Sequence, residues 1–218
     1  FWVEFFVQPI DTLPSEFYKF DGMIREWFFK TNWYITYDLF EFILSHFTKT
    51  HIADKLRSEL NRYLEQEKAA YRFVGSVATE ITDDIEIAEI ESIFTLKDDF
   101  TNIKKHFQTA LILMNDRSNP DYRNSIKESI SAVEAICRHI INDEKASLGA
   151  ALKKLKDQGL SIHASLEKSW GSMYGYTSDE AGIRHALNSE ETITFAEAKY
   201  MLVACAAFVN YLLQVSQK

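Results

Sequence analysis

The chain has 218 residues, 46% hydrophobic and 26% charged, which is typical of a soluble globular protein with one large domain or two small ones. Its 7 glycines and 3 prolines favour long helices over a β fold with many turns. The formal net charge of −8 argues against nucleic-acid binding through bulk charge, although residues 115–218 are nearly neutral, with 12 basic and 13 acidic residues, and can still gather a local basic patch.

The sequence contains no recognisable motif for binding a metal or a cofactor. The two cysteines, Cys137 and Cys205, lie in apolar helical stretches and are predicted to be reduced core residues of a cytoplasmic protein. No Cys/His spacing, phosphate loop or dinucleotide motif occurs, so we expect no metal and no cofactor. The apolar run 200–215 is short for a membrane span and contains Asn210, so we expect no membrane association.

Aromatic residues dominate the stretch 14–47, which we interpret as two helices with a break near Thr31-Asn32. Rings at helical spacing usually pack in the interior, so we predict that these rings form a core. A base-stacking platform is the alternative, but basic residues are not interleaved with the rings. The rings are Phe17, Tyr18, Phe20, Trp27, Phe28, Phe29, Trp33, Tyr34, Tyr37, Phe40, Phe42 and Phe47.

The next stretch predicts a helix followed by a hairpin. Apolar residues spaced four apart (Ile52, Leu56, Leu60 and Leu64) indicate an amphipathic helix over 50–69. Two short strands, Tyr71–Val74 and Val77–Ile81, are expected on either side of Gly75-Ser76. Because a lone two-stranded ribbon is marginally stable, it must pack on helices.

Capping signals divide the remainder into helices. Asp83 with Glu86 predicts a helix through Phe94, and Asn119 followed by Pro120 predicts the start of a long helix. Gly171 and Gly175 predict a bend, and Thr177 with Glu180 predicts a further helix start. The expected helices are 96–116 and 120–143, which we expect to be antiparallel, 147–158 ended by Gly159, 162–174, and Phe195–Val215 capped by Thr194 and Glu197.

The adjacent Arg184 and His185 are the leading candidates for chemistry. A histidine can take the 2′-hydroxyl proton of RNA or protonate the leaving oxygen, and an arginine can hold the phosphate and stabilise the charge that develops on it. Neighbouring residues on a helix point about 100° apart, so they share one target only at a helix end or bend, which Gly182 makes credible. The alternative is that Arg184 forms an ion pair and His185 caps or packs.

Charged residues of the long helix could line the same cleft. Arg123, Lys127 and Glu134 lie on its polar side, because residues seven apart share a face. Asp179 precedes Arg184 and is a further candidate for substrate binding or for pairing with that arginine. Ordinary surface charge or a dimer interface is the alternative for this group.

Two sets of stretches resemble known families. Asn119–Arg138 and Ser178–Ala186, with the apolar helix after them, resemble a HEPN domain, an all-α module common in prokaryotic defence proteins. Ahead of them Tyr71–Gly75, Glu80–Thr82, Glu86-Ile87 and Ile90-Glu91 are similar to an AbiJ-type (abortive infection) amino-terminal domain. The resemblance implies an AbiJ-like domain over 1–94 and a HEPN-like helical bundle over 95–218. Together with the hairpin, this gives an all-α protein with one small β-hairpin.

The resemblance also implies a function and an assembly. HEPN ribonucleases cleave RNA without a metal and pair about a two-fold axis, so a homodimer through the HEPN-like half is expected. They carry an arginine followed four to six residues later by a histidine, whereas here Arg184-His185 and Arg138-His139 are adjacent. Two hypotheses follow: a metal-independent anti-phage endoribonuclease acting on host or phage RNA, or a non-catalytic module that binds nucleotide, RNA or a defence protein as sensor, adaptor or dimerisation unit.

Overall fold

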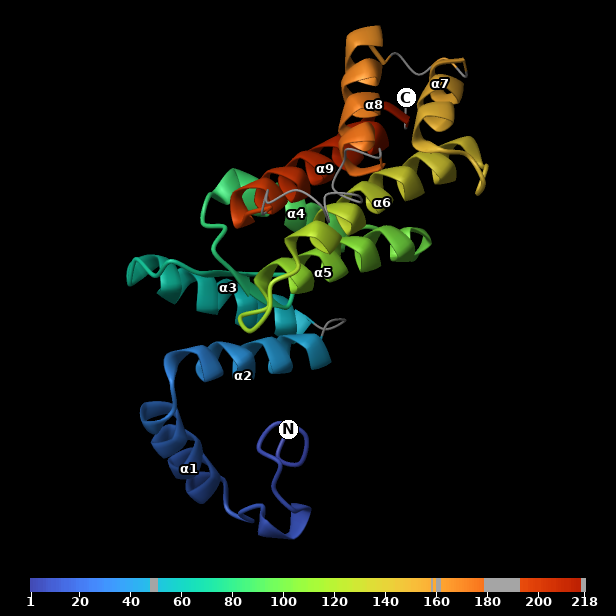
Figure 1. The fold of residues 1–218 in the computed structure, drawn as a ribbon. Helices are drawn as coiled ribbons and strands as arrows, with labels where there is room; N and C mark the ends of the chain where they lie inside the picture. Colours follow the sequence, from blue (N-terminus) through green and yellow to red (C-terminus); the bar gives the residue numbers. More distant parts are fainter. Residues whose placement is uncertain (48–50, 158, 160–161, 179–192, 217–218) are drawn as a thin grey trace. The chain divides into compact units, whose positions relative to one another are not determined.

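A computed structural model describes residues 1–47, 51–157, 159, 162–178 and 193–216 (Figure 1). The described chain is mainly helical with one two-stranded antiparallel hairpin, which confirms the predicted fold class. It divides into two compact units, Phe1–Glu80 and Ile81–Lys218. The helices are α1 (Phe17–Lys30), α2 (Trp33–His46), α3 (His51–Gln66), α4 (Asp84–Phe94), α5 (Thr101–Asn115), α6 (Tyr122–Ile141), α7 (Leu148–Asp157), α8 (Ala164–Ser178) and α9 (Phe195–Ser216).

The hairpin of the first unit forms where the sequence predicts it. Strand β1 (Arg72–Val74) pairs with β2 (Val77–Thr79), and Val74 lies opposite Val77. Gly75 has a φ of +58°, a left-handed conformation that glycine adopts without steric cost. The two-residue turn Gly75-Ser76 therefore sets the register.

Helix side chains satisfy both outer edges of this ribbon. In a hairpin of this register the backbone groups of Phe73 and Ala78 point away from the partner strand. Asn61 of α3 donates to Phe73 O at 2.8 Å and accepts from Phe73 N at 2.7 Å, as a neighbouring strand would. Glu41 of α2 accepts from Ala78 N at 2.7 Å. The predicted need for helix packing is met by these hydrogen bonds.

Beneath the ribbon lies a small core made by α2, α3 and the two strands. Leu44, Ala53, Phe73 and Ala78 are its buried members. Three of the four residues in the predicted α3 stripe pack on it, but Ile52 is mostly exposed and the neighbouring Ala53 is buried instead. The partly buried residues around this core are Tyr37, Phe40, Leu56, Leu60 and Leu64.

Helix α1 departs from the predicted aromatic core. Its inner side packs on the N-terminal segment, where Trp27 lies 5.1 Å from Phe6 and 5.9 Å from Phe5 between ring centroids. No residue of α1 is buried, so core packing is the wrong interpretation for its outer rings. The physical reason is that α1 is packed along one side only. The strongly exposed rings of this helix are Phe17, Tyr18 and Phe29.

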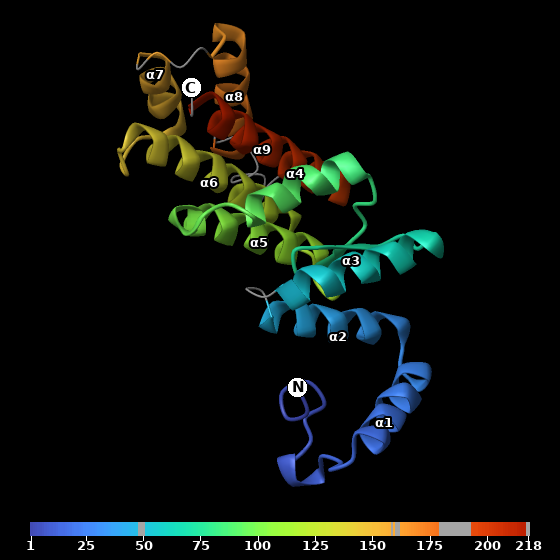
Figure 2. The same cartoon turned by 180° about the vertical axis from the view of Figure 1, so that it is seen from behind.

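The second unit is a helical bundle built around α6. This helix packs against α5 and α9, while α4 packs on α9 (Figure 2). Helices α7 and α8 pack on each other and on α6. The buried stripe on α6 recurs every three or four residues and comprises Ile126, Ile130, Val133, Cys137 and Ile141 among others.

The start of α6 differs from the prediction. The sequence predicts Asn119 as the cap and Pro120 as the first helical residue, but Asp121 is the cap, accepting from Asn124 N at 2.9 Å. Asp116 closes a turn just before it by accepting from the amides of Ser118 and Asn119. Pro120 therefore lies between this turn and the helix rather than in the first helical position.

Helix α8 also differs from the prediction. The sequence predicts a bend at Gly171 and Gly175, but the helix continues through both glycines to Ser178. Thr177 lies inside α8, where its hydroxyl donates to Tyr174 O at 2.8 Å, so it is not the predicted N-cap. Its predicted partner Glu180 lies outside the described residues. A glycine pair costs a helix some stability but does not end it when neighbouring contacts hold the backbone.

Helix α4 belongs to the second unit. Asn210 of α9 donates to Glu89 O at 3.0 Å, to Glu89 Oε2 at 2.6 Å and to Ser92 Oγ at 2.8 Å. Lys199 Nζ lies 2.6 Å from Glu86 Oε2. The compact units therefore divide before α4, whereas the sequence places the domain boundary after it, at residue 94.

Among the described residues, α9 is the one helix long and apolar enough by composition to cross a membrane. Core helices meet the same criterion. Here α9 packs on α4, α5 and α6, and its buried residues include Met201, Leu202, Cys205, Val209 and Leu212. The stacked rings of Trp170 and Phe208, 3.9 Å apart, join α8 to it. In this fold α9 is therefore a buried core helix of the second unit.

Candidate functional site

Two cations lie on the first turns of α6. Arg123 and Lys127 are four residues apart, so they share one side of the helix, and both are partly exposed. Lys127 Nζ donates to Asn124 Oδ1 at 3.0 Å, a neutral partner. In the part of the chain that the structure describes, neither cation forms an ion pair with a carboxylate. Their positive charge is uncompensated there, as an anion-binding surface requires.

Glu134, the third residue predicted on α6, forms an ion pair within the helix. Its Oε1 lies 3.6 Å from the guanidinium of Arg138, and its side chain is 15% exposed. Arg138 also donates from Nε to Ala146 O at 2.7 Å, which fixes the chain between α6 and α7. The structure thus places Glu134 in a contact that holds the end of α6, two turns from Lys127.

The other predicted residues, Arg184, His185 and Asp179, lie outside the described residues. The chain that carries them leads directly into the start of α9. That start adjoins the first turn of α6, where the rings of Tyr122 and Phe195 have centroids 6.3 Å apart. Phe195, at the start of α9, therefore lies beside the first turn of α6, which carries Arg123.

The start of α9 is fixed by the predicted capping pair. Glu197 Oε2 accepts from Thr194 N at 2.6 Å and from Thr194 Oγ1 at 2.9 Å. These hydrogen bonds lower the pKa of Glu197 from its ordinary value of 4.5. The Thr194 hydroxyl donates to the carboxylate here, whereas a reciprocal capping box would have it accept from a main-chain amide.

A histidine and a carboxylate meet between α5 and α6. His106 Nδ1 lies 2.6 Å from Glu128 Oε2, and each side chain is about one-third exposed (33% and 32%). A carboxylate that holds one ring nitrogen orients the imidazole for proton transfer at the other. The same contact also ties two helices together, and no second reactive group accompanies it among the described residues.

His106 belongs to no sequence motif, and one signal could have found its partner. Helices α5 and α6 are predicted to be antiparallel, so residues equally far from the turn at 116–119 face each other. Ser125 Oγ donates to Ala110 O at 2.8 Å in this register. The same register places Glu128 opposite His106.

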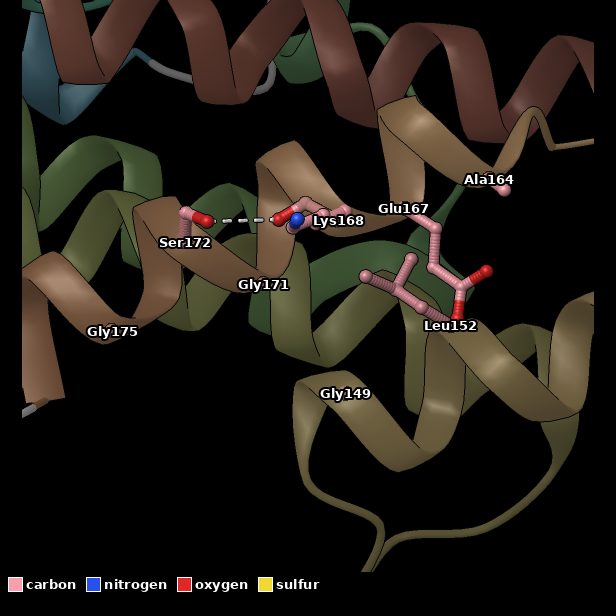
Figure 3. A pocket seen from close by; sticks show the side chains of 8 residues that line it. All are labelled: Gly149, Leu152, Ala164, Glu167, Lys168, Gly171, Ser172 and Gly175. Carbon is pink, nitrogen blue, oxygen red and sulfur yellow. Dashed lines mark hydrogen bonds between the residues drawn. The ribbon is translucent and has the colours of Figure 1, made fainter.

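An open groove of about 670 Å³ lies between α7 and α8 (Figure 3). Small residues spaced three or four apart on α8 make this space, because they leave the helix surface without side-chain bulk. Glu167 at its side is 3.7 Å from Lys156 Nζ. Its lining residues are Gly149, Leu152, Ala164, Glu167, Lys168, Gly171, Ser172 and Gly175.

The described residues offer no group of three or more His, Cys, Asp or Glu side chains that could hold a metal. Cys137 and Cys205 are both buried, free thiols. Burial raises the pKa of Cys137 to about 12, with the Glu134 carboxylate adding to the rise and Arg138 partly offsetting it. Burial also raises the pKa of Cys205. Neither is a nucleophile in the folded protein.

Comparison with known families identifies the N-terminal part. Residues 3–96 match the family AbiJ N-terminal domain 4. This region is therefore an AbiJ-type N-terminal domain, as predicted, and it sets the protein in the context of abortive infection. The match extends through α4, so the family region ends close to the predicted boundary at residue 94 and beyond the first compact unit. No curated protein and no solved structure matches the chain.

Proposed function

We propose that this protein is an abortive-infection endoribonuclease whose HEPN-like helical half cleaves host or phage RNA without a metal. Arg184 and His185 are the catalytic residues in this proposal, and Arg123 and Lys127 hold the substrate phosphates. The observation that supports it is the pair of cations on α6 near the start of α9, which form no ion pair with any carboxylate among the described residues. The AbiJ-type domain supports the biological context.

The chemistry needs one group that moves protons and one that holds the phosphate. His185 accepts the proton of the 2′-hydroxyl as the 2′-oxygen attacks phosphorus, and the bond from phosphorus to the 5′-oxygen breaks. The leaving 5′-oxygen takes a proton from solvent water and His185 returns its proton to solvent, so the products are a 2′,3′-cyclic phosphate and a 5′-hydroxyl. Arg184 stabilises the negative charge on the phosphoryl oxygens.

Assembly and setting follow from the same proposal. A homodimer through residues 95–218 would bring two copies of the site to one seam, since a two-fold interface uses the same patch on both chains. Such a protein works in the cytoplasm, where it meets RNA, and another defence protein is a suitable partner for its N-terminal domain. In this proposal Asp179, which precedes Arg184 in the sequence, contributes to the same substrate-binding site.

The test is cleavage of end-labelled transfer RNA and single-stranded RNA in EDTA. We expect cleavage of RNA but not of the same sequence with 2′-deoxyribose, because the 2′-hydroxyl is the nucleophile. The R123A/K127A variant should lose about tenfold or more in cleavage rate as two phosphate contacts are removed. The matched control K145A/K153A removes two exposed cations from elsewhere in the same unit and should keep the activity.

A binding module without turnover is the second candidate. Its support is the adjacency of Arg184 and His185, which departs from the spacing of HEPN ribonucleases, together with the net charge of −8. This candidate predicts that RNA or nucleotide binds and is recovered intact. R123A/K127A would then weaken binding, and no labelled product would form with any substrate.

A further inference from the structure

The outer side of α1 carries four aromatic rings that are exposed in the described structure. Phe17, Tyr18, Phe28 and Phe29 are 80%, 68%, 42% and 74% exposed. The opposite side of the helix, with Phe20 and Trp27, contacts the N-terminal segment. A cluster of exposed rings on one helix face is a contact surface rather than ordinary surface variation.

The four rings form two pairs, Phe17 with Tyr18 at one end of the helix face and Phe28 with Phe29 at the other. The two pairs are eleven residues apart, which is about three helical turns. Between the pairs lies Gly22, where an added Cβ would meet no atom within 4 Å. The middle of the face therefore has little side-chain bulk at Gly22, whereas aromatic rings project at both ends.

Two opposite charges occupy the middle of this face. Asp21 and Arg25 are one turn apart, and neither forms an ion pair with any described residue. The Arg25 guanidinium instead lies 5.8 Å from the centroid of Phe29. The charged residues on the other side of α1 form ion pairs, Lys19 with Glu16 and Lys30 with Glu26.

We propose that this face binds a second copy of itself, with the two α1 helices antiparallel about a two-fold axis level with Met23. In that arrangement Asp21 meets the partner's Arg25, and Arg25 meets the partner's Asp21. Phe17 lies level with the partner's Phe29, and Tyr18 lies level with the partner's Phe28. The face is complementary to itself in both charge and ring position, as a two-fold interface requires.

The size of the face sets the strength of the contact. The exposed parts of four rings amount to about 500 Å² in each chain, so the interface buries about 1,000 Å² in total. That is the low end of specific protein interfaces, and we expect self-association that depends on concentration in the micromolar range. A nucleic acid fits this face less well, because its one cation is matched by one carboxylate on the same helix side.

Charge exchange tests the proposal on the full chain. Sedimentation analysis between about 1 and 100 μM should show a mass that rises with concentration. D21R and R25D should each raise the dissociation constant about tenfold or more, because like charges then meet across the axis. The double variant D21R/R25D should associate as the wild type does. A mixture of D21R and R25D should also associate, because each chain then supplies the charge that the other lacks.

Matched controls separate this effect from folding or from nonspecific charge. E26R and K30D make the same changes of charge on α1 but away from the ring face, and should leave association unchanged. Circular dichroism should show equal helix content for all variants. The proposal is overturned if D21R and the wild type have the same mass at every concentration, or if the mixture of D21R and R25D shows no greater mass than either variant alone. The result is independent of RNA cleavage.

Discussion

Burial decides what the two thiols of the second unit can do. Cys137 and Cys205 are both shielded by the helices around them, and burial raises both pKa values, that of Cys137 to about 12. We predict that neither thiol reacts with a thiol reagent at pH 8 while the protein is folded, and that both react in denaturant. A Ser165→Cys variant supplies an exposed thiol as the positive control. Stoichiometric labelling of the native wild type would contradict the prediction.

The Thr194–Glu197 contact gives α9 a dependence on pH. Because hydrogen bonds lower the pKa of Glu197, its carboxylate stabilises the folded state above its ordinary pKa of 4.5. That stabilisation is lost as the pH falls through the lowered pKa. We expect Glu197→Gln to lower the melting temperature at pH 7. In acid, where the wild-type Glu197 is protonated and as neutral as the glutamine, the two melting temperatures should be equal. Glu144→Gln, at an exposed carboxylate, is the control, and a Glu197→Gln difference that persisted in acid would count against this account.

Single residues of the candidate site were partly predictable. The period of α6 correctly puts Arg123 and Lys127 on its polar side, because helical spacing alone decides that. The engagement of Glu134 by Arg138 was not anticipated, since an ion pair at 3.6 Å depends on rotamers that spacing does not specify. His106 and Glu128 were missed because each looks like surface charge until the two helices are aligned.

At the scale of elements, the hairpin depends on one side chain from a helix. Asn61 forms two hydrogen bonds with the backbone of Phe73, at 2.7 and 2.8 Å. Asn61→Ala leaves an amide and a carbonyl without these partners, so we predict a loss of about 2 kcal/mol in the free energy of unfolding. Gln66→Ala, an exposed amide on the same helix, should cost less than about 0.5 kcal/mol. Denaturant unfolding followed by circular dichroism measures both, and equal stabilities would contradict this role.

Elements were predictable where a local signal dominated. The turn Gly75-Ser76 and the cap Asp83 act within a few residues, and the structure confirms the hairpin and the start of α4. The start of α6 was predicted wrongly because Asp116 holds a turn that overrides the preference of Pro120 for a first helical position. Gly171 suggested a bend, but α8 continues through it to Ser178.

At the scale of the whole molecule, long-range contacts decide what sequence patterns leave open. Three hydrogen-bond contacts of Asn210 join α9 to α4, which is more than a hundred residues away in the sequence. These contacts assign α4 to the second unit. Local pattern carries no trace of such a pairing. The outer rings of α1 illustrate the same limit, because the sequence reports that Phe17 is apolar but not whether anything covers it.

Catalysis by Arg184 and His185 can be tested in a single experiment. The rate of RNA cleavage in EDTA should be compared between the wild type and R184A/H185A, with both proteins shown to be folded. We expect cleavage by the wild type and a loss of about a hundredfold or more in the variant, the scale expected when a general acid–base group is removed. Equal cleavage by the two proteins, or no cleavage by the wild type, would contradict it.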